Sequence, residues 1–270
     1  MAVRLALVVA LASCGKSEAP AAAPRGQTIE VAVIGGMIET GFWQALAERY
    51  ELVSGNKIHV AATGPKPQVI AAFRKGGIEL ITVHASDAMI NLVADGVAID
   101  PQPWARNDLV IVGPAADPAK IKGERDALVA LRKIVAAKAP LLVHASMGAD
   151  GVLHDLQEID RELSDRESTI LFDSDNQHEV LAKAAASGAY TMVGRIPFKS
   201  GKLKAAGVEL MVEGDPRLRR PYLVELSPTA SPAARDLAAY LRSTDTQHWI
   251  ATWGVGKLDD QPVFFPVTVQ

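Results

Sequence analysis

Short apolar, β-branched runs alternate with helical patterns along the chain from residue 28 onward. Apolar residues at steps of three and four indicate a helix, as in Phe42, Leu46, Tyr50 and Val53. The expected strands are Thr28–Ile34, Ile58–Ala62, Leu80–Val83, Leu109–Val112, Leu141–His144, Ser168–Phe172, Ala189–Val193, Val208–Val212 and Tyr222–Leu226. The expected helices are Thr40–Val53, Val69–Lys75, Asp87–Asp95, Arg125–Lys138, Gly148–Leu163, Asn176–Ser187, Ala233–Ser243 and Thr246–Trp253. This alternation predicts an α/β fold with largely parallel sheets, whose ligands bind outside the carboxyl ends of the strands.

Composition narrows the class of protein further. The chain has 270 residues, which suits one large domain or two lobes. The single cysteine excludes an intramolecular disulfide framework and any cysteine-rich metal module. A net charge of −3 argues against a dedicated nucleic-acid binder, which would carry a basic excess. A charged fraction of 22% beside 49% apolar residues is not a disordered composition.

The N-terminal residues are typical of a secretory signal peptide. Arg4 precedes a short apolar run from Leu5 to Ala12, whereas a membrane-spanning helix needs about 20 apolar residues. The run ends in Leu11-Ala12-Ser13-Cys14, which resembles the bacterial lipobox and implies cleavage before an acylated Cys14. The alternative is an incidental cysteine in an ordinary signal. We expect residues 1–13 to be the signal peptide and residues 14–27, rich in Ala, Pro and Gly, to be a flexible lipidated tether.

One short sequence occurs twice, each time between an expected strand and a helix. Val83-His84-Ala85-Ser86 and Val143-His144-Ala145-Ser146 are identical at all four positions. If the two copies belong to different lobes, they face each other across a cleft, where hydroxyls and helix amides would bind an anion. The alternative is coincidence, because four residues of common types repeat only once.

Several stretches, in order, resemble bacterial extracytoplasmic solute-binding proteins of ABC importers, of the tungstate-binding type. The resemblance covers residues 28–266, and the stretches that carry it are Leu80–Ala85, Asn107–Pro114, Asp117–Gly123, Lys138–Pro140, Gly188–Thr191 with Arg195, Val212–Leu218 and Pro262–Pro266.

The resemblance implies a two-lobed periplasmic-binding-protein-like fold with two crossing strands as the hinge, near Leu109–Val112 and Tyr222–Leu226. Lobe 1 would comprise residues 28–110 and 218–270, and lobe 2 residues 111–217. A small molecule or small anion would bind between the lobes and close the hinge, and the closed monomer would dock on a permease. Such a protein is a periplasmic or cell-envelope binder held at the membrane by its lipid. It has no catalytic group, metal or cofactor.

The residues that should wrap an oxyanion depart from that family. A run of threonines and a serine is replaced after the first strand by Val33–Ile38, and a serine-arginine-glycine-aspartate segment is replaced by Val143–Asp150. Thr63-Gly64 survives, although Pro65-Lys66-Pro67 alters its loop. Charge-assisted hydrogen bonds contribute roughly 1.5–3 kcal/mol each, so losing three or four would remove on the order of 5–10 kcal/mol. We therefore expect a relative that has changed its ligand, toward an organic or less charged molecule.

The candidate ligand-binding residues lie at the expected strand ends and helix starts. Thr40, Ser86 and Ser146 are alternatively helix caps, the two histidines strand-end residues bonded to backbone, and Arg195 part of an ion pair. The candidates are Gly35, Gly36, Met37, Thr40, Thr63, His84, Ser86, His144, Ser146, Met147 and Arg195.

Two other functions fit some of the same residues. A metal-dependent enzyme would need His84, His144, Asp150 and His154 as zinc ligands, but their spacing matches no known motif. An importer-independent carrier or sensor would share the fold and anchor, and adjacent permease and ATPase genes would favour import over it.

Overall fold

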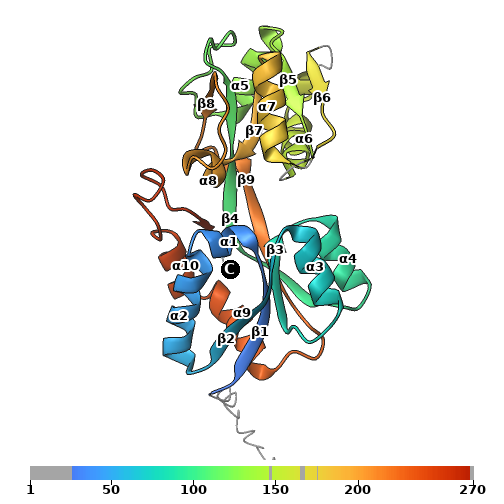
Figure 1. Cartoon of the computed structure of the whole chain (residues 1–270), viewed down its shortest axis with the longest axis vertical. Coiled ribbons are helices and arrows are strands. Elements are labelled where there is room, and N and C mark those ends of the chain that lie inside the picture. Colours follow the sequence, from blue (N-terminus) through green and yellow to red (C-terminus); the bar gives the residue numbers. More distant parts are fainter. Residues whose placement is uncertain (1–25, 146–147, 165–167, 175, 268–270) are drawn as a thin grey trace, which may run out of the picture.

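The structure, a computed structural model, describes residues 26–145, 148–164, 168–174 and 176–267. Two α/β lobes lie one above the other and are joined by two long strands (Figure 1). Ser146 and Met147 lie outside the described residues, as do the signal peptide and most of the tether with Cys14.

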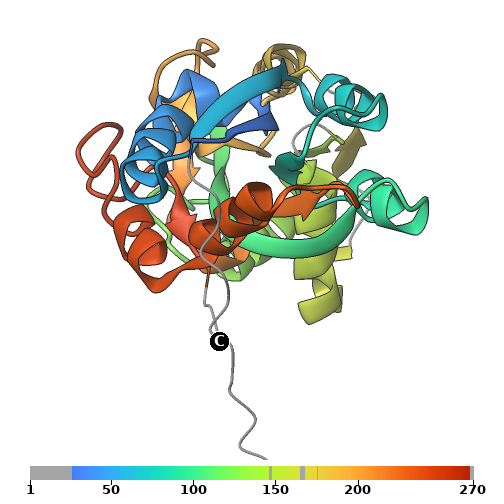
Figure 2. The same ribbon diagram turned by 90° about the horizontal axis from the view of Figure 1, so that it is seen from below.

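Lobe 1 is built on one mixed sheet with the strand order β10-β4-β9-β3-β1-β2. β1 (Thr28–Ile34) pairs in parallel with both β2 (Lys57–Gly64) and β3 (Leu80–His84), and β3 pairs antiparallel with β9 (Arg219–Leu226). The short β10 (Phe265–Pro266) pairs antiparallel with β4. The helices of this lobe are α1 (Gly35–Glu39), α2 (Phe42–Ser54), α3 (Lys66–Arg74), α4 (Asp87–Ala94), α9 (Pro232–Arg242) and α10 (Thr244–Ile250). They surround the sheet from several sides (Figure 2).

Lobe 2 comprises the chain between the two long strands. β7 (Thr191–Gly194) and β8 (Val208–Val212) both pair antiparallel with the far half of β4, and β5 (Leu141–Val143) pairs in parallel with β6 (Thr169–Leu171). Its helices are α5 (Ala127–Ala136), α6 (Ala149–Ile159), α7 (Gln177–Ser187) and α8 (Arg195–Lys199), with short 3-10 turns at Arg161–Ser164 and Pro216–Leu218.

β4 (Ile99–Pro114) is a 16-residue strand that belongs to both lobes. Its residues up to Asp108 pair with β9, and its residues from Leu109 pair with β7. The strand is therefore much longer than the predicted Leu109–Val112, because Asp100, Pro101 and Pro103 interrupt the apolar pattern without ending the strand. The predicted two-lobed α/β fold with two crossing strands is confirmed. The prediction of largely parallel sheets is wrong, because the crossing strands β4 and β9 pair antiparallel with each other and with their neighbours β3, β7, β8 and β10.

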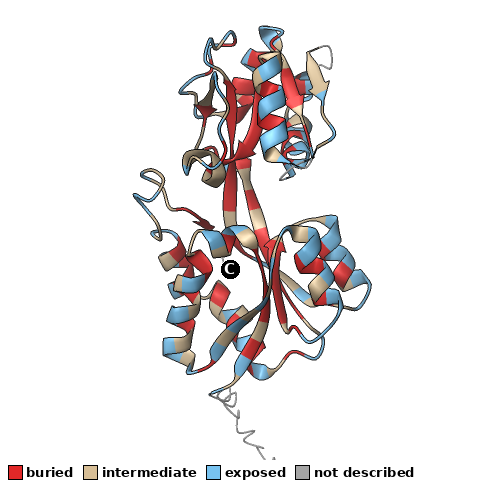
Figure 3. Ribbon diagram, in the orientation of Figure 1, coloured by how far each residue is buried: buried red, intermediate tan, exposed pale blue. Residues whose placement is uncertain are grey.

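Each lobe has its own hydrophobic core. The larger one gathers buried residues from Ile29 to Ala105 and from Tyr222 to Phe264, and a second one gathers residues from Leu109 to Leu218. Buried segments accordingly alternate with exposed ones in both lobes, and the crossing strands are largely buried (Figure 3). Ser231 caps α9, as its Oγ accepts from the Ala234 amide at 3.2 Å.

After α10 the chain leaves lobe 1 and returns to it, forming a segment that we call the C-terminal strap (residues 251–264). The strap rises beside the crossing strands toward α8 of lobe 2 and comes back to β10 (Figure 1). Neither α1 nor α8, the two short helices near the strap and the hinge, was expected from the apolar periodicity, because five residues are too few to show it.

Candidate ligand-binding cleft

A cleft of about 710 Å³ lies between the lobes. Lobe 1 contributes residues from the carboxyl ends of its strands and the helices that follow, namely Ile34, Gly35, Gly36, Glu39, Thr40, Gly64, Pro65, Lys66, Pro67 and His84. Lobe 2 contributes Ala145, Gly148, Gln177, Ile196, Pro197, Ser200 and Lys202. The crossing strands and the strap complete the wall with Asn107, Arg220, Tyr222, Lys257, Leu258 and Val263. The cleft therefore occupies the position that the strand-end rule predicts.

Strand register brings the polar side chains of the cleft floor together. Asn107 of β4 lies directly opposite Arg220 of β9, and His84 of β3 lies opposite Tyr222 of β9. The rings of His84 and Tyr222 contact each other in a tilted arrangement, with centroids 4.1 Å apart and an interplanar angle of 32°. Arg220 Nη2 donates to Asn107 Oδ1 at 3.1 Å and lies 3.2 Å from His84 Nε2. Three neighbouring strands thus hold one guanidinium group at the point where the lobes meet.

Arg220 is the dominant charge of this floor. The Arg220 residue is 8% exposed, and no carboxylate of the described residues lies within ion-pair distance of its guanidinium group. Nε is buried with no hydrogen-bond partner in the described part of the chain. A Cβ added to Gly148 of lobe 2 would lie 3.9 Å from Nη1, so this nitrogen reaches toward the opposite lobe. Burial lowers the pKa of Arg220 to about 10, although the more distant charge of Asp108 acts in the opposite direction. Arg220 is therefore a cation at neutral pH, and it has no ion-pair partner among the described residues.

Lys66 adds a second cation from lobe 1. It is the first residue of α3, and Pro65 before it and Pro67 after it fit the first helical turn, where the missing amide hydrogens cost nothing. Burial, and next the positive charge of Arg220, lower the pKa of Lys66, while Asp150 of lobe 2 acts in the opposite direction. The two cations therefore repel each other, and an anion bound beside both would offset that repulsion.

His84 is neutral and acts as a hydrogen-bond acceptor in this cluster. Burial, followed by the charges of Arg220 and Lys66, holds the pKa of His84 well below its ordinary value. Because a guanidinium can only donate, His84 Nε2 accepts from Arg220 Nη2. With Asn107, it fixes the plane of the guanidinium.

Of the residues predicted from sequence, Gly35, Gly36, Thr40 and His84 line the cleft. Thr40 Oγ1 donates to backbone oxygens of Gly36 and Met37 at 2.9 and 3.2 Å, which is the role of a helix-end residue. The other described candidates do not line it: Met37, Thr63, Ser86, His144 and Arg195.

Each of these five has a physical reason to lie elsewhere. The turn of α1 carries Met37 into the core of lobe 1 with no exposed surface, and Thr63 points outward from the edge strand β2. Ser86 precedes α4, and its Oγ lies 3.5 Å from the His84 oxygen. His144 is buried in lobe 2, where Nε2 donates to the Met192 oxygen at 2.7 Å.

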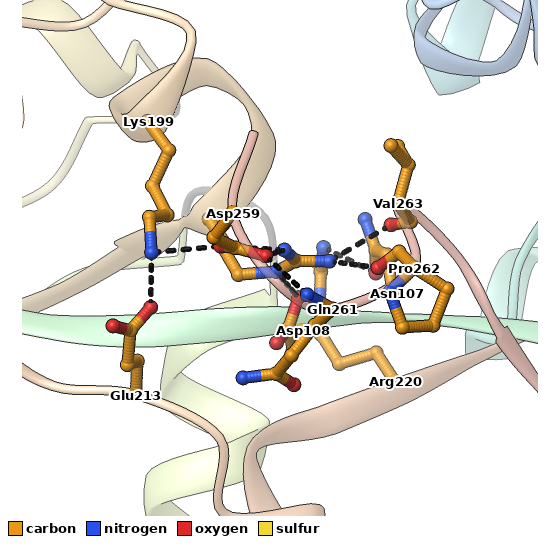
Figure 4. Close-up of polar contacts among 10 residues, drawn as sticks. Asn107, Asp108, Lys199, Glu213, Arg220, Asp259, Gln261, Pro262 and Val263 are labelled. Carbon is orange, nitrogen blue, oxygen red and sulfur yellow. Dashed lines mark hydrogen bonds and ion pairs between the residues drawn. The ribbon is translucent and has the colours of Figure 1, made fainter. Parts of the chain in front are cut away.

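Arg195 is fully buried in a cluster that joins lobe 2 to the strap. Figure 4 labels its partners Asp108, Asp259, Pro262 and Val263. Nε donates to Asp108 Oδ1 at 2.7 Å, Nη1 donates to both oxygens of Asp259 at 3.0 Å, and Nη2 donates to the backbone oxygens of Pro262 and Val263. Lys199 pairs with Asp259 at 2.7 Å. The positive charge of Arg195 is thus fully used between lobes and is not offered to the cleft.

Sequence reasoning passed over Lys66, Asn107 and Arg220. A signal for the last was available, since Arg219 and Arg220 stand between apolar residues and a buried strand. Nothing in the sequence pairs Arg220 with Asn107, which is 113 residues away.

The proposed zinc set is not assembled in this structure. His144 is bonded to backbone, and His154 lies on the exposed surface of α6, 3.4 Å from Glu158. In the described part of the chain, no three His, Cys, Asp or Glu side chains gather into a group that could bind a metal ion. No helix among the same residues has the length and apolar character needed to cross a bilayer.

Comparison with known proteins agrees with this geometry. The family model described as bacterial extracellular solute-binding protein matches residues 29–255. The tungstate-binding protein TupA of Peptoclostridium acidaminophilum is 25% identical over 281 residues, covering 96% of this chain and 94% of its own. Two solved structures share the fold. The tungstate-binding protein TupA of Desulfovibrio alaskensis G20 has a TM-score of 0.70 and 22% identity, and the match covers 90% of this chain and 100% of that one. The tungstate ABC transporter structure from Geobacter sulfurreducens has a TM-score of 0.63 and 22% identity, and the match covers 84% of this chain and 98% of that one. The family model matches most of the chain, and the structure has the cleft between two lobes described above. The chain therefore belongs to the bacterial extracellular solute-binding protein family.

Proposed function

We propose that this protein captures a small anionic solute in the interlobe cleft and delivers it to the permease of an ABC importer. The observation that carries the proposal is Arg220, a nearly buried cation at the cleft floor with no carboxylate partner in the described residues. An uncompensated buried charge is costly, so a site that keeps one is suited to a ligand that brings the opposite charge. The tungstate-binding relative, which covers nearly the whole chain, supports the anion, and a 26% identical relative described as a putative ABC transporter anion-binding protein supports the importer.

The solute is held differently from the oxyanion of the tungstate-binding type. In that family the resemblance implies hydroxyl groups after the first strand and an arginine before the α6 equivalent. Here Ile34, Gly35 and Gly36 occupy the first place, and no arginine stands between His144 and Asp150. Arg220 reaches toward Gly148 in that second region from the crossing strand instead. We therefore propose that the cleft retains affinity for an anion and has lost tight binding of tungstate.

The test compares Arg220→Gln with the wild-type protein. Small molecules released by denaturing the purified protein are identified by mass spectrometry, and thermal shifts are recorded against a panel of anions. The wild type should release or be stabilised by an anion that Arg220→Gln does not bind. Arg74→Gln is the matched control, because Arg74 is an exposed arginine paired with Asp95 on the far side of lobe 1. A neutral or cationic solute, or equal anion binding by Arg220→Gln, would refute the proposal.

Calorimetry with tungstate, molybdate and sulfate tests the altered ligand shell. Weak binding of all three is expected, because the hydroxyl shell is absent. Nanomolar affinity for tungstate would show that the ligand is unchanged.

We further propose that the mature protein begins at Cys14 and is held at the periplasmic side of a membrane by lipid. The lipobox-like Leu11-Ala12-Ser13-Cys14 and the Ala- and Pro-rich segment after it support this. The full chain with Cys14→Ser should move from the membrane fraction to the soluble envelope fraction, whereas Ser17→Ala should not. Retention of Cys14→Ser at the membrane would rule out the anchor.

Uptake of the released anion by cells lacking the adjacent permease would favour an importer-independent carrier.

A further inference from the structure

We infer that the anion taken by this cleft is an organic carboxylate, with its acidic group at Arg220 and an apolar body of several carbons against both lobes. The inference rests on the proposed function, since it names the chemical class of the same solute. Three features of the cleft lead to it: the walls, the occupied hydroxyls and the distribution of charge.

The walls of the cleft are aliphatic. Lobe 1 presents Ile34, Pro65 and Pro67, and lobe 2 presents Ile196 and Pro197 from α8. The strap adds Leu258 and Val263 beside α8. A volume of about 710 Å³ lies within the range of roughly 300–1,000 Å³ typical of sites for organic ligands. Apolar surface on both lobes would be buried against an apolar ligand when the hinge closes, which adds to binding in proportion to the area covered.

The hydroxyl groups at the rim are already engaged. Thr40 donates to the backbone oxygens of Gly36 and Met37, and Ser200 donates to the Pro197 oxygen at 3.2 Å. A tetrahedral dianion has four oxygens that all need donors when water is excluded. With these hydroxyls turned to backbone, such an ion would leave several oxygens unpaired in this cleft.

The charges of the cleft form a single cationic pole. Lys202 pairs with Glu39 across the mouth at 2.6 Å, and Lys257 Nζ lies 4.1 Å from the centroid of the Trp253 ring. Among the described lining residues, Arg220 and Lys66 are then the cations without an ion-pair or ring partner. Two neighbouring cations at one end of an apolar cleft match a molecule with one acidic group and an uncharged body.

The test is a chain-length series measured by calorimetry on the full mature chain: acetate, butanoate, hexanoate and octanoate, with hexanol and hexylamine as uncharged and cationic counterparts. Each buried methylene contributes about 0.8 kcal/mol, so Kd should fall about fourfold per methylene until the cleft is filled. Hexanol and hexylamine should not bind, and Arg220→Gln should abolish hexanoate binding. Ile196→Ser and Leu258→Ser, two partly exposed positions on separate elements of the cleft wall, should each reduce the gain in affinity per methylene.

The outcomes separate this inference from the proposed function. Tighter binding of sulfate or tungstate than of hexanoate, abolished by Arg220→Gln, would overturn the organic ligand and leave the anion-binding function in place. A carboxylate series without dependence on chain length would also overturn it. Hexanoate binding that persists in Arg220→Gln would refute the proposed function itself. Failure of every carboxylate to bind would overturn the inference, since acetate to octanoate spans the sizes that this cleft admits.

Discussion

Arg195 Nη1 lies 3.0 Å from both carboxylate oxygens of Asp259, and this contact joins α8 of lobe 2 to the C-terminal strap of lobe 1. The same guanidinium donates to Asp108 of the crossing strand and to two backbone oxygens of the strap. The Arg195 side chain is fully buried, and that of Asp108 is 1% exposed. The strap is therefore a third connection between the lobes. It is made by side-chain contacts, whereas β4 and β9 connect the lobes through the polypeptide backbone.

Arg195→Gln should destabilise the protein by about 3–5 kcal/mol, because it leaves the Asp108 carboxylate buried without its partner. Burial already raises the pKa of Asp108 in spite of Arg195, and losing the cation raises it further. An acid whose folded pKa is raised loses stability as pH rises, so the variant should be weaker at pH 8 than at pH 5. Urea denaturation at both pH values measures this.

Lys202→Gln is the control, since Lys202 and Glu39 form an interlobe pair in which both side chains are 61% exposed. Its effect should stay below about 1 kcal/mol. Equal effects of the two substitutions would show that the buried cluster contributes nothing beyond an exposed pair.

Glu225→Gln should stabilise the protein at alkaline pH. Glu225 has no exposed surface in β9, and neither carboxylate oxygen has a hydrogen-bond partner in the described chain. Burial raises its pKa to about 7. The folded state thus binds a proton that the unfolded state releases near pH 4.3, and stability falls as pH rises from there through about 7. At pH 8 the variant should gain about 3–4 kcal/mol over the wild type, with little difference at pH 4.5. The same gain at both pH values would contradict the assigned ionisation.

Asn107→Asp should increase stability and weaken anion binding at the same time. The new carboxylate would lie opposite Arg220, about where Asn107 Oδ1 now accepts at 3.1 Å. It would supply the counter-charge that we assign to the ligand, so the affinity for anions should fall at least tenfold. Asn107→Ala is the matched comparison, because it removes an acceptor from Arg220 and should lower stability by about 1 kcal/mol or more. Unfolding midpoints of the free proteins, together with thermal shifts by the retained anion, distinguish the two. Unchanged anion affinity in Asn107→Asp would argue against Arg220 as the ligand's partner.

Gly113→Ala should lower the free energy of unfolding, whereas Gly151→Ala should raise it. A Cβ at Gly113 would lie 2.2 Å from Tyr190 Cδ1, and the ring cannot withdraw because its hydroxyl donates to Asp117 at 2.7 Å and accepts from the Ala119 amide at 3.0 Å. Overpacking of this kind costs about 1–3 kcal/mol or more. Gly151 lies in α6 with nothing within 4 Å of its added Cβ, so alanine there should stabilise by about 0.5–1 kcal/mol. Chemical denaturation of both variants checks the signs, and a neutral Gly113→Ala would mean that Tyr190 moves freely.

The fold was predictable because apolar periodicity is local. Thr28–Ile34 and Val208–Val212 are strands with the predicted bounds, since each is a mostly apolar run with a single glutamate. The cleft floor was not predictable in the same way. Asn107 and Arg220 lie just outside the apolar runs by which the crossing strands were located, and their contact depends on the register of two strands far apart in sequence. Arg195 illustrates the complementary case: its sequence position suggests a cleft cation, and only the strap, 64 residues further on, supplies its partner.

The position of β9 between β3 and β4 also determines the order in which the protein can fold. Lobe 2 is formed by one continuous stretch of chain, so all of its elements are available before β9 arrives. The sheet of lobe 1 lacks an interior strand until residues 219–226 arrive, although three of its strands come from the first third of the sequence. The sheet formed by β1, β2 and β3 therefore keeps an unpaired edge at β3 until lobe 2 and then β9 have been added. A polypeptide that crosses a membrane N-terminus first would thus remain unfolded in lobe 1 for most of its passage and acquire its ligand cleft as the last structural event.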